Sequence, residues 1–425
     1  MSKHVDSYYA ATANNKEDYP VLRQDLECDV CIVGAGFSGL SAGLHLAEQG
    51  FKVVILESVK VGFGATGRNG GQIVNSYSRD VDVIEKRYDK KTAQALCNMI
   101  FEGGDIIRQR IEQYNIDCDH RAGGLFTALN HKQFEALKHH KQNWERYGHT
   151  ELTLLDGEEL KSCVGTDVYQ GGLLDMTGGH IHPLNLALGE AAAIVSLGGQ
   201  IFEHSAVTRI EKGAKPVAHT EHGSVKAQYL LLAGNAYLGD LAPNVTNKAI
   251  PCGTQVIATE PLSQDLADEL LPQRYCVEDC NYLLDYFRIT ADNRMLFGGG
   301  VVYGAREPAS IEREIRPKME KVFPQLQEIK LDYAWSGNFL LTYSRMPQFG
   351  HFSNNIYYLQ GYSGHGVTCT HLAGKLLAEA LQGNTERFDA FASLTHLAFP
   401  GGRHLQIPLT AMGAAYYNLR DKLAI

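Results

Sequence analysis

Hydrophobic residues follow two different patterns at the start of the chain, and together they predict a β-α-β unit. A continuous apolar run ends at Val33, a glycine-rich turn follows, and apolar residues then recur at helical spacing from about residue 38 to residue 49. Gly50 ends this helix, and a second continuous apolar run occupies residues 52–57. Uninterrupted apolar strands are typical of a parallel sheet that is covered on both faces.

Helical patterns dominate the next part of the chain. Residues 81–115 and 132–147 are rich in charge and have helical periodicity, and a more apolar helix is predicted over about 184–197. A pair of short strands is expected at 200–203 and 206–211. The polar residues 1–25 have no regular period and are expected to form a lead-in segment.

Strand patterns return after residue 228. The apolar run 229–239 contains two glycines and is expected to be a further strand of the first sheet. Aromatic, β-rich segments then follow Pro251, at 255–260, 283–290 and 294–304. Ala291-Asp292-Asn293 separates the last two and is a hairpin signal. An antiparallel sheet, and with it a second domain, is therefore predicted, completed by a helix near 309–322 and by residues 332–339.

Composition narrows the class of protein. The 425 residues are 44% apolar, carry a net charge of −9, and contain no block of lysine and arginine. This balance argues against a nucleic-acid partner and against an anionic membrane surface. No run approaches the roughly 18 apolar residues that a membrane-spanning helix needs. The first residues, MSKHVDSYYAATANN, lack the apolar segment of a signal peptide, so none is expected. We expect a soluble, cytoplasmic protein.

The nine cysteines have no disulfide spacing, which suits a reducing compartment. Cys28 and Cys31 form a C-x-x-C sequence, but they fall within the first predicted strand, where residues three apart face opposite sides. We interpret them as buried structural cysteines. Cys276 and Cys280 lack a second ligand pair, so no metal site is predicted.

The first glycine-rich turn matches the pattern G-x-G-x-x-G at Gly34, Gly36 and Gly39, between a strand and a helix. Glu57 ends the next strand, where a carboxylate commonly bonds the ribose of a bound dinucleotide. An acidic residue at this place disfavours a 2′-phosphate and therefore NADP. This motif alone leaves FAD and NAD open.

The segment 62–72, GFGATGRNGGQ, contains five glycines in eleven residues. Such a loop exposes backbone N–H groups and allows a flat ligand to approach closely. A flavin dinucleotide is longer than NAD and needs a second binding loop at this point, which favours FAD. The alternative is a mobile surface loop.

A second strand, glycine-rich turn and helix occur at residues 356–381, where IYYLQ leads into GYSGHGVTCTHLAGK. A helix N-terminus places positive potential near its first turn. Directed at the flavin ring, it would stabilise the negative charge that appears on reduction. The alternative is an ordinary glycine turn in which His365 is a simple polar residue.

Several long motifs resemble the D-amino-acid oxidase/glycine oxidase superfamily of FAD enzymes. They are GFGATGRNGGQIVNSYSRD, GGHIHPLNLA, NAYLGD, CGTQVIATE, CVEDCNYLLDYFR and LQGYSGHGVTCTHLAG. The likeness runs from SYYAATAN near the start to TAMGAAYYNLRDKL at the end, so it covers essentially the whole chain. The later motifs are more specific than the G-x-G-x-x-G turn.

The resemblance implies an α/β, two-domain (α+β) fold, in which a Rossmann-like FAD-binding domain is interleaved with a substrate domain built on an antiparallel sheet. The FAD-binding domain is expected at 26–85, 166–252 and 340–425, and the substrate domain at 86–165 and 253–339. FAD is expected to be noncovalent, because the segment 344–350, SRMPQFG, lacks the cysteine that some relatives use for attachment.

The residues expected to bind FAD lie in the glycine-rich turns and at nearby strand ends. They are Gly34, Gly36, Phe37, Ser38, Gly39, Glu57, Ser58, Gly64, Ala65, Thr66, Gly67, Arg68, Asn69, Gly70, Gly71, Gln72, Val207, Gly234, Gly361, Gly364, His365, Gly366, Val367 and Thr368.

The resemblance also implies a reaction: the primary amine of gamma-glutamylputrescine, or of a similar gamma-glutamyl amine, is oxidised to an aldehyde, with release of ammonia and hydrogen peroxide, in putrescine catabolism. Hydride transfer to the flavin, imine hydrolysis and reoxidation by oxygen need no acid/base pair from the protein. The partners are then a small amine and O2.

Aromatic candidates for the amine pocket are Tyr286, Trp335 and Tyr362, with core packing as the alternative for each. Arg288, two residues from Tyr286 on one strand, could bind a glutamyl carboxylate, or could be an ordinary arginine; Arg68 is a second substrate-binding candidate. His365 could bond near the flavin carbonyl or assist proton removal. His180 and His182 are interpreted as loop structure.

Two other functions stay open at this point. A dehydrogenase would pass electrons to a quinone or a carrier protein instead of oxygen. A noncatalytic flavoprotein subunit is the third reading, which the substrate-domain pattern disfavours.

Overall fold

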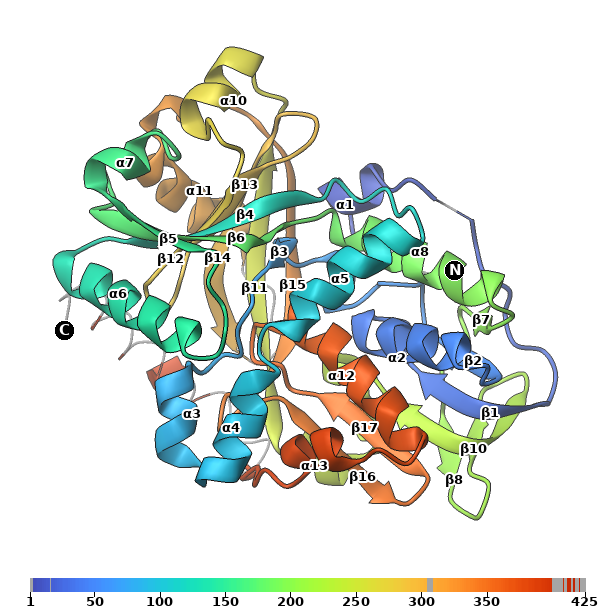
Figure 1. Ribbon diagram of the computed structural model, residues 1–425. Helices are drawn as coiled ribbons and strands as arrows, with labels where there is room; N and C mark the ends of the chain where they lie inside the picture. The colour runs from blue at the N-terminus through green and yellow to red at the C-terminus, as the bar shows by residue number, and fades with distance from the viewer. Residues whose placement is uncertain are drawn as a thin grey trace.

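The computed structural model describes residues 3–15, 17–303 and 309–399, together with residues 408, 411–413, 416 and 420. Two sheets form the framework, one in the lower half of Figure 1 and one in the upper half. Most of residues 400–425, which were expected to end the FAD-binding domain, lie outside the described residues. Along the described chain no helix is both long and apolar enough to span a membrane.

The first sheet has the strand order β16-β17-β10-β1-β2-β7, with β9 and β8 attached at β10. The pairs β17–β10, β10–β1, β1–β2 and β2–β7 are parallel, whereas β16 pairs with β17 in the antiparallel direction. Its strands are β1 (Leu26–Val33), β2 (Val53–Leu56), β7 (Gln200–Phe202), β8 (Arg209–Glu211), β9 (Val217–His219), β10 (Ser224–Leu232), β16 (Gln348–Ser353) and β17 (Ile356–Gln360).

The second sheet has the order β15-β11-β14-β13-β12-β4-β6-β3, and β5 pairs with β6. All of its described pairs are antiparallel except β12–β4. Its strands are β3 (Gln72–Ile73), β4 (Arg121–Ala128), β5 (Leu152–Asp156), β6 (Gly171–His180), β11 (Ala249–Thr259), β12 (Cys276–Asp279), β13 (Tyr286–Ile289), β14 (Met295–Tyr303) and β15 (Leu331–Thr342).

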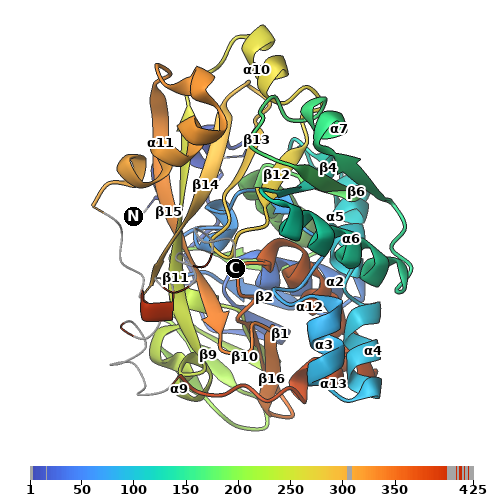
Figure 2. The same cartoon turned by 90° about the vertical axis from the view of Figure 1, so that its left-hand side faces the viewer.

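The helices gather mainly around these two sheets (Figures 1 and 2). They are α1 (Tyr8–Ala11), α2 (Phe37–Glu48), α3 (Val81–Arg87), α4 (Lys90–Asn98), α5 (Glu102–Gln113), α6 (His131–Glu145), α7 (Gly157–Lys161), α8 (Pro183–Ser196), α9 (Pro243–Thr246), α10 (Gln264–Leu270), α11 (Ile311–Val322), α12 (Gly366–Leu381) and α13 (Glu386–Ala392). In Figure 2, α11 lies beside the long strands β14 and β15.

The predicted elements are confirmed where the hydrophobic pattern was strong. The β1-α2-β2 unit, the strand β10 and the hairpin β13–β14 have the expected order and pairing. The short strands expected at 200–203 and 206–211 exist, but β7 pairs with β2 and β8 with β9. The strands β4, β5, β6 and β12 were missed, because each is glycine-rich, short or charged.

One expected assignment differs from the structure. Residues 166–252 were placed with the FAD-binding domain, yet β6 pairs with β3, β4 and β5 in the second sheet. Its glycines allow this close pairing: a Cβ at Gly179 would lie 2.1 Å from the carbonyl oxygen of Arg121, and one at Gly172 would lie 2.9 Å from that of Phe126. The chain therefore enters the second sheet at β3 and again at β6, before β11.

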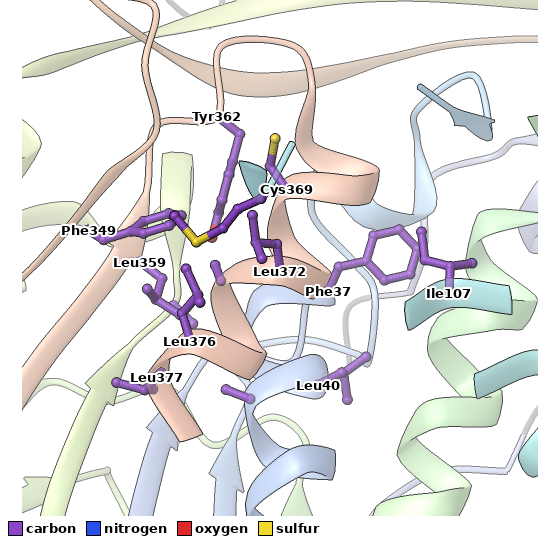
Figure 3. Close-up of a cluster of buried hydrophobic side chains, with 14 of the residues drawn as sticks. Phe37, Leu40, Ile107, Phe349, Leu359, Tyr362, Cys369, Leu372, Leu376 and Leu377 are labelled. Atoms are coloured by element: carbon purple, nitrogen blue, oxygen red, sulfur yellow. The ribbon is translucent and has the colours of Figure 1, made fainter. Parts of the chain in front are cut away.

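The helices α2 and α12, which come from opposite ends of the chain, pack directly against each other. A Cβ at Gly374 of α12 would lie 2.4 Å from the hydroxyl of Ser41 on α2, so only glycine permits this distance. Buried side chains surround the crossing, among them Leu40, Leu372 and Leu376 (Figure 3). This contact fixes the N-terminal ends of both helices relative to the first sheet.

The second sheet has two chemically different faces at β12 and β13. Val277 pairs with Phe287, and Phe287 pairs with Phe297; all three are buried in an apolar core that includes Ile315 of α11. Because side chains alternate along a strand, the intervening residues face the other way. That opposite face forms part of the site described below.

Candidate functional site

A cavity of about 1430 Å³ is lined by residues of both sheets and of their connecting loops. This exceeds the roughly 300–1,000 Å³ of a usual small-molecule pocket. The turn after β1, the loop 62–72 and the start of α12 all contribute to its wall, although they are far apart in the sequence. The cavity is therefore large enough for an extended ligand and a second, smaller one.

The first glycine-rich turn joins β1 to α2 and lines this cavity. Gly34 has φ of +109°, and a Cβ there would lie 2.9 Å from the carbonyl oxygen of Ala233. Gly36 is the N-cap of α2, which has no acidic residue in its first turn and no side-chain cap. The hydroxyl of Thr66 accepts the N–H of Phe37 at 3.0 Å. The backbone groups of this turn can therefore approach an anionic ligand closely.

Glu57 lines the cavity at the end of β2, as the motif predicted. Its carboxylate accepts the N–H groups of Ala35 at 2.8 Å and Val59 at 2.9 Å. Burial raises its pKa, against the effect of these hydrogen bonds. Glu57 thus holds the turn after β1 against the end of β2 while its side chain borders the cavity.

The loop 62–72 is fixed by its own side chains. The Asn69 amide donates to the carbonyl oxygen of Thr66 at 2.8 Å and accepts the N–H of Gly71 at 2.7 Å. The Arg68 Nε donates to the carbonyl oxygen of Phe63 at 2.9 Å, and its guanidinium lies over the Phe63 ring. Thr66 and Arg68 are each only 8% exposed. The loop is therefore a buried wall rather than the alternative of a mobile surface segment.

The second glycine-rich turn brings the N-terminus of α12 to the same cavity. Ser363 and Gly364 have φ of +56° and +99°, and His365 is the N-cap of the helix. The helix has no acidic residue in its first turn and no side-chain cap, so its first N–H groups keep their positive potential. Thr368 fixes the first turn, because its hydroxyl donates to the carbonyl oxygen of Val74 at 2.7 Å.

His365 is held as a neutral side chain. Its Nδ1 lies 3.0 Å from the hydroxyl of Ser76. Burial and, to a smaller extent, the nearby positive charge of Arg345 lower the pKa of His365 to about 4. At neutral pH this imidazole can exchange hydrogen bonds in the cavity without carrying a charge.

Two of the three expected aromatic residues line the cavity. The Tyr362 hydroxyl lies 2.7 Å from that of Ser38, and the Tyr286 hydroxyl lies 3.2 Å from that of Thr254. Burial raises the pKa of both phenols, so both stay protonated. A Cβ at Gly70 would lie 2.5 Å from the ring of Tyr286, so this glycine makes room for the ring.

Trp335, the third aromatic candidate, does not line the cavity. It is 2% exposed and packs in an apolar cluster with Tyr9 and Val256. Its indole Nε1 donates to the carbonyl oxygen of Arg68 at 3.0 Å. Trp335 therefore supports the loop 62–72 from behind, which corresponds to the core-packing alternative.

Arg288 also differs from its expected position. Its Nε donates to the carbonyl oxygen of Gly70 at 3.0 Å, and its Nη2 donates to that of Ile181 at 3.0 Å and to the Tyr9 hydroxyl at 3.2 Å. The side chain is 2% exposed and does not line the cavity. Arg288 joins three segments of the chain rather than presenting its guanidinium to a substrate.

Four expected glycines lie behind the cavity wall rather than on it. They are Gly39, Gly67, Gly71 and Gly361. A Cβ at Gly39 would lie 2.0 Å from the carbonyl oxygen of Gly34, and one at Gly67 would lie 2.6 Å from that of Gly62. These glycines therefore shape the turns, while their neighbours form the surface. All the other residues expected to bind FAD line the cavity, and so do the substrate candidates Arg68, Tyr286 and Tyr362.

Several charged residues of the wall were missed, among them one glutamate and three arginines. Glu278 of β12 lines the cavity near Tyr286, and Arg345, with φ of +64°, lines it near His365. Arg79 and Arg87 also contribute, and both donate to the carbonyl oxygen of Ser344. Glu278 lies beside a second charged residue, Asp279, in a strand of four residues, so no local pattern marked it.

Comparison with known proteins identifies the family to which the chain is similar. Residues 29–380 match the family model described as "DAO: FAD dependent oxidoreductase". The gamma-glutamylputrescine oxidoreductase of Escherichia coli (strain K12) is 61% identical over 426 residues, covering 100% of both chains. A probable oxidoreductase, OrdL, of Haemophilus influenzae is 42% identical over 99% of this chain and 98% of its own length.

Solved structures show the same fold. The glycine oxidase of Geobacillus kaustophilus gives a TM-score of 0.73 at 19% identity, covering 88% of this chain and 100% of that chain. The L-proline dehydrogenase of P. horikoshii also gives 0.73, at 20% identity, covering 85% of this chain and 95% of that one. The two-domain α/β expectation is therefore confirmed.

The cavity fits the cofactor of that family. The uncapped N-termini of α2 and α12 and the glycines that keep Cβ atoms out of the turns suit a phosphate-bearing, flat and extended ligand. From the match over residues 29–380, from the full-length relatives and from this site, it follows that the chain belongs to the family of FAD dependent oxidoreductases.

Proposed function

We propose that this enzyme oxidises the primary amine of gamma-glutamylputrescine, or of a similar gamma-glutamyl amine, to the aldehyde, with release of ammonia and with O2 reduced to hydrogen peroxide. The relative from E. coli that carries this substrate in its name matches the full length of the chain at 61% identity. The observation that carries the proposal is that one continuous cavity runs from the turn after β1 to a second sheet bearing Tyr286 and Glu278.

In this proposal the first sheet and its turns hold the cofactor, and the second sheet binds the substrate. Bound FAD supplies the hydride acceptor. Gly34, Gly36 and Glu57 would hold its dinucleotide part, and the loop 62–72 with the start of α12 would hold the flavin. Uncapped N–H groups at α12 stabilise negative charge nearby, and so favour a reduced state.

The protein's own residues orient the amine and exclude water. Tyr286 and Tyr362 present aromatic surface to the cavity, and both phenols are anchored by hydroxyl partners. Neutral His365 can accept or donate a hydrogen bond beside them. Arg345 replaces Arg288 as the proposed partner of the glutamyl carboxylate, because it lines the cavity and no described residue forms an ion pair with it.

Anaerobic mixing with gamma-glutamylputrescine tests the proposal. We expect the absorption band of the flavin to bleach, and hydrogen peroxide, ammonia and aldehyde to form once air is admitted. An N-acetylated substrate, which cannot be oxidised at this nitrogen in the same way, is the control. Bleaching without peroxide would show a dehydrogenase, and no bleaching would contradict the proposed substrate.

A further inference from the structure

Glu278 presents a carboxyl group to the cavity from β12. It lies directly opposite Tyr286 of β13 in the antiparallel register, so both side chains are on one face of the sheet. The neighbours of Glu278 face the other way: Val277 is buried in the core beneath α11, and Asp279 hydrogen-bonds Asn281. Both Glu278 and Tyr286 line the cavity.

The Glu278 carboxyl has no partner within the described chain. No ion pair or hydrogen bond to its oxygens occurs there, whereas Asp285, close by in sequence, pairs with Lys318 at 2.6 Å. Burial raises the pKa of Glu278 to about 8, and the adjacent charge of Asp279 contributes. Glu278 is half-buried and borders the cavity, so its carboxyl oxygens are open to a ligand there. Such a group beside a ligand cavity is a candidate for binding the ligand.

The surroundings of Glu278 suit a cation. The Tyr286 ring lies on the same face, and aromatic rings attract cations. The other titratable groups near it are Asp279, the thiols of Cys276 and Cys280, and Asp175, which lines a small cavity that Glu278 also borders. Burial raises the pKa of both thiols, and the Asp175 carboxylate lies 3.1 Å from Nε2 of His149 and accepts the N–H of Thr177 at 2.9 Å.

We propose that Glu278 receives the ammonium group of the substrate and takes up the proton that this group must lose before oxidation, an inference that rests on the proposed function. The step starts from the ionised form of Glu278, which the positive charge of the bound ammonium group favours. It breaks one N–H bond and forms one O–H bond: an ammonium ion and a carboxylate become a neutral amine and a carboxylic acid. No electron is transferred in this step. The neutral amine then has the free electron pair that oxidation of its carbon requires.

The test compares Glu278→Gln with wild type and with Glu221→Gln, which makes the same change at a side chain that is 85% exposed. Each FAD-loaded enzyme is mixed anaerobically with gamma-glutamylputrescine from pH 7 to pH 10, and the rate of flavin bleaching is measured. FAD content and thermal midpoint are recorded for each variant. Glu221→Gln is expected to match wild type throughout.

For Glu278→Gln we expect flavin reduction to slow by about 100-fold at pH 7, the low end of the range for proton transfer by a side chain. The deficit should shrink toward pH 10, because a primary amine with a pKa of about 10.4 then loses its proton in solution. FAD content should equal that of wild type. A deficit below threefold at pH 7, or one that stays constant up to pH 10, would overturn the inference.

Two further results separate this inference from the proposed function. If gamma-glutamylputrescine does not reduce the flavin of the wild-type enzyme, the substrate proposal fails. The same pH series is then run with a primary amine that does bleach the flavin. If no primary amine bleaches it, the Glu278 inference fails as well. If the Glu278→Gln variant does not fold, the rate of flavin reduction is measured with Glu278→Asp instead. We expect it to be about tenfold slower than wild type, and equality with wild type would overturn the role of Glu278.

Discussion

The hydroxyl groups of Ser38 and Tyr362 lie 2.7 Å apart, and this buried hydrogen bond joins the start of α2 to the turn before α12. The two residues are 324 positions apart in the chain. The two glycine-rich turns are therefore two parts of one site, rather than two separate nucleotide sites.

Removing this bond should weaken both the fold and the binding of FAD. Tyr362→Phe leaves the buried Ser38 hydroxyl without that partner, so we expect a loss of about 1–3 kcal/mol in the free energy of unfolding. Unfolding in urea and FAD titration of the apoprotein measure the two effects. In the double variant with Ser38→Ala, part of the loss should be recovered; strictly additive effects would show that the two hydroxyls are not coupled.

Gly364 should be needed for flavin chemistry, beyond its effect on stability. It has φ of +99° with open space around the Cβ position, and Gly383, just after the other end of α12, has φ of +96° with equally open space. Alanine at either position should cost about 1 kcal/mol from the left-handed backbone. Only Gly364→Ala should also alter FAD affinity or the rate of flavin reduction. If the two variants have the same FAD affinity and the same rate of flavin reduction, Gly364 has no specific role in the site.

Substitution of Arg288 should affect mainly the stability of the fold, whereas substitution of Arg345 should affect mainly the binding of substrate. Arg288→Lys removes donors from the buried carbonyl groups of Gly70 and Ile181, and we expect it to cost about 2–3 kcal/mol of stability and to loosen FAD. Arg345→Met should leave stability nearly unchanged and raise KM at least tenfold. Thermal unfolding and steady-state kinetics separate the two; a KM effect confined to Arg288→Lys would reverse the assignment.

Stability should fall as the solution becomes acidic. Burial lowers the pKa of His182 to about 3 and of His365 to about 4, below the unfolded value of about 6.5. Between these values each of these two histidines binds more protons in the unfolded chain than in the native one, so each contributes a free energy of unfolding that rises with pH from about 4 to 6.5. Denaturant unfolding of the FAD-loaded protein at pH 4.5, 5.5 and 6.5 should show this trend. In the His365→Gln variant the free energy of unfolding should rise less steeply with pH. An unchanged slope would contradict the neutral state of His365.

FAD should leave the protein without breaking a covalent bond. The segment 344–350, SRMPQFG, contains no cysteine, and every cysteine except Cys280 is buried. After acid precipitation the yellow colour should stay in the supernatant. A yellow pellet that keeps its colour after washing would show covalent attachment.

The elements that could be predicted most reliably from the sequence are those whose interacting residues are close together in the chain. A strand, a glycine turn and a helix are adjacent in the chain, so the turns at Gly34 and Gly364 were found with the residues that line the cavity. Their pattern also predicted the parallel pairing of β1 and β2. Local backbone rules are sufficient at these places.

Side-chain direction in the second sheet was harder to predict, because it depends on partners far along the chain. Tyr286 and Arg288 share one face of β13, as expected, and both lie against Gly70. Only Tyr286 reaches the cavity, because the Arg288 guanidinium donates to Gly70, Ile181 and Tyr9. Glu278 was missed because its short strand becomes visible only through pairing with β4 and β13. No local pattern specifies such contacts.

The central position of β1 in the first sheet has a consequence for biosynthesis. Its neighbours are β2, which follows at once, and β10, which is completed only at Leu232; the strand β17 and the helix α12 come after residue 355. A chain still emerging from the ribosome therefore has the first half of its cofactor site long before the second. Because both halves border one cavity, FAD can be enclosed only when synthesis is nearly finished. Until then the strands of the first half must fold without the ligand that contacts both ends of the chain.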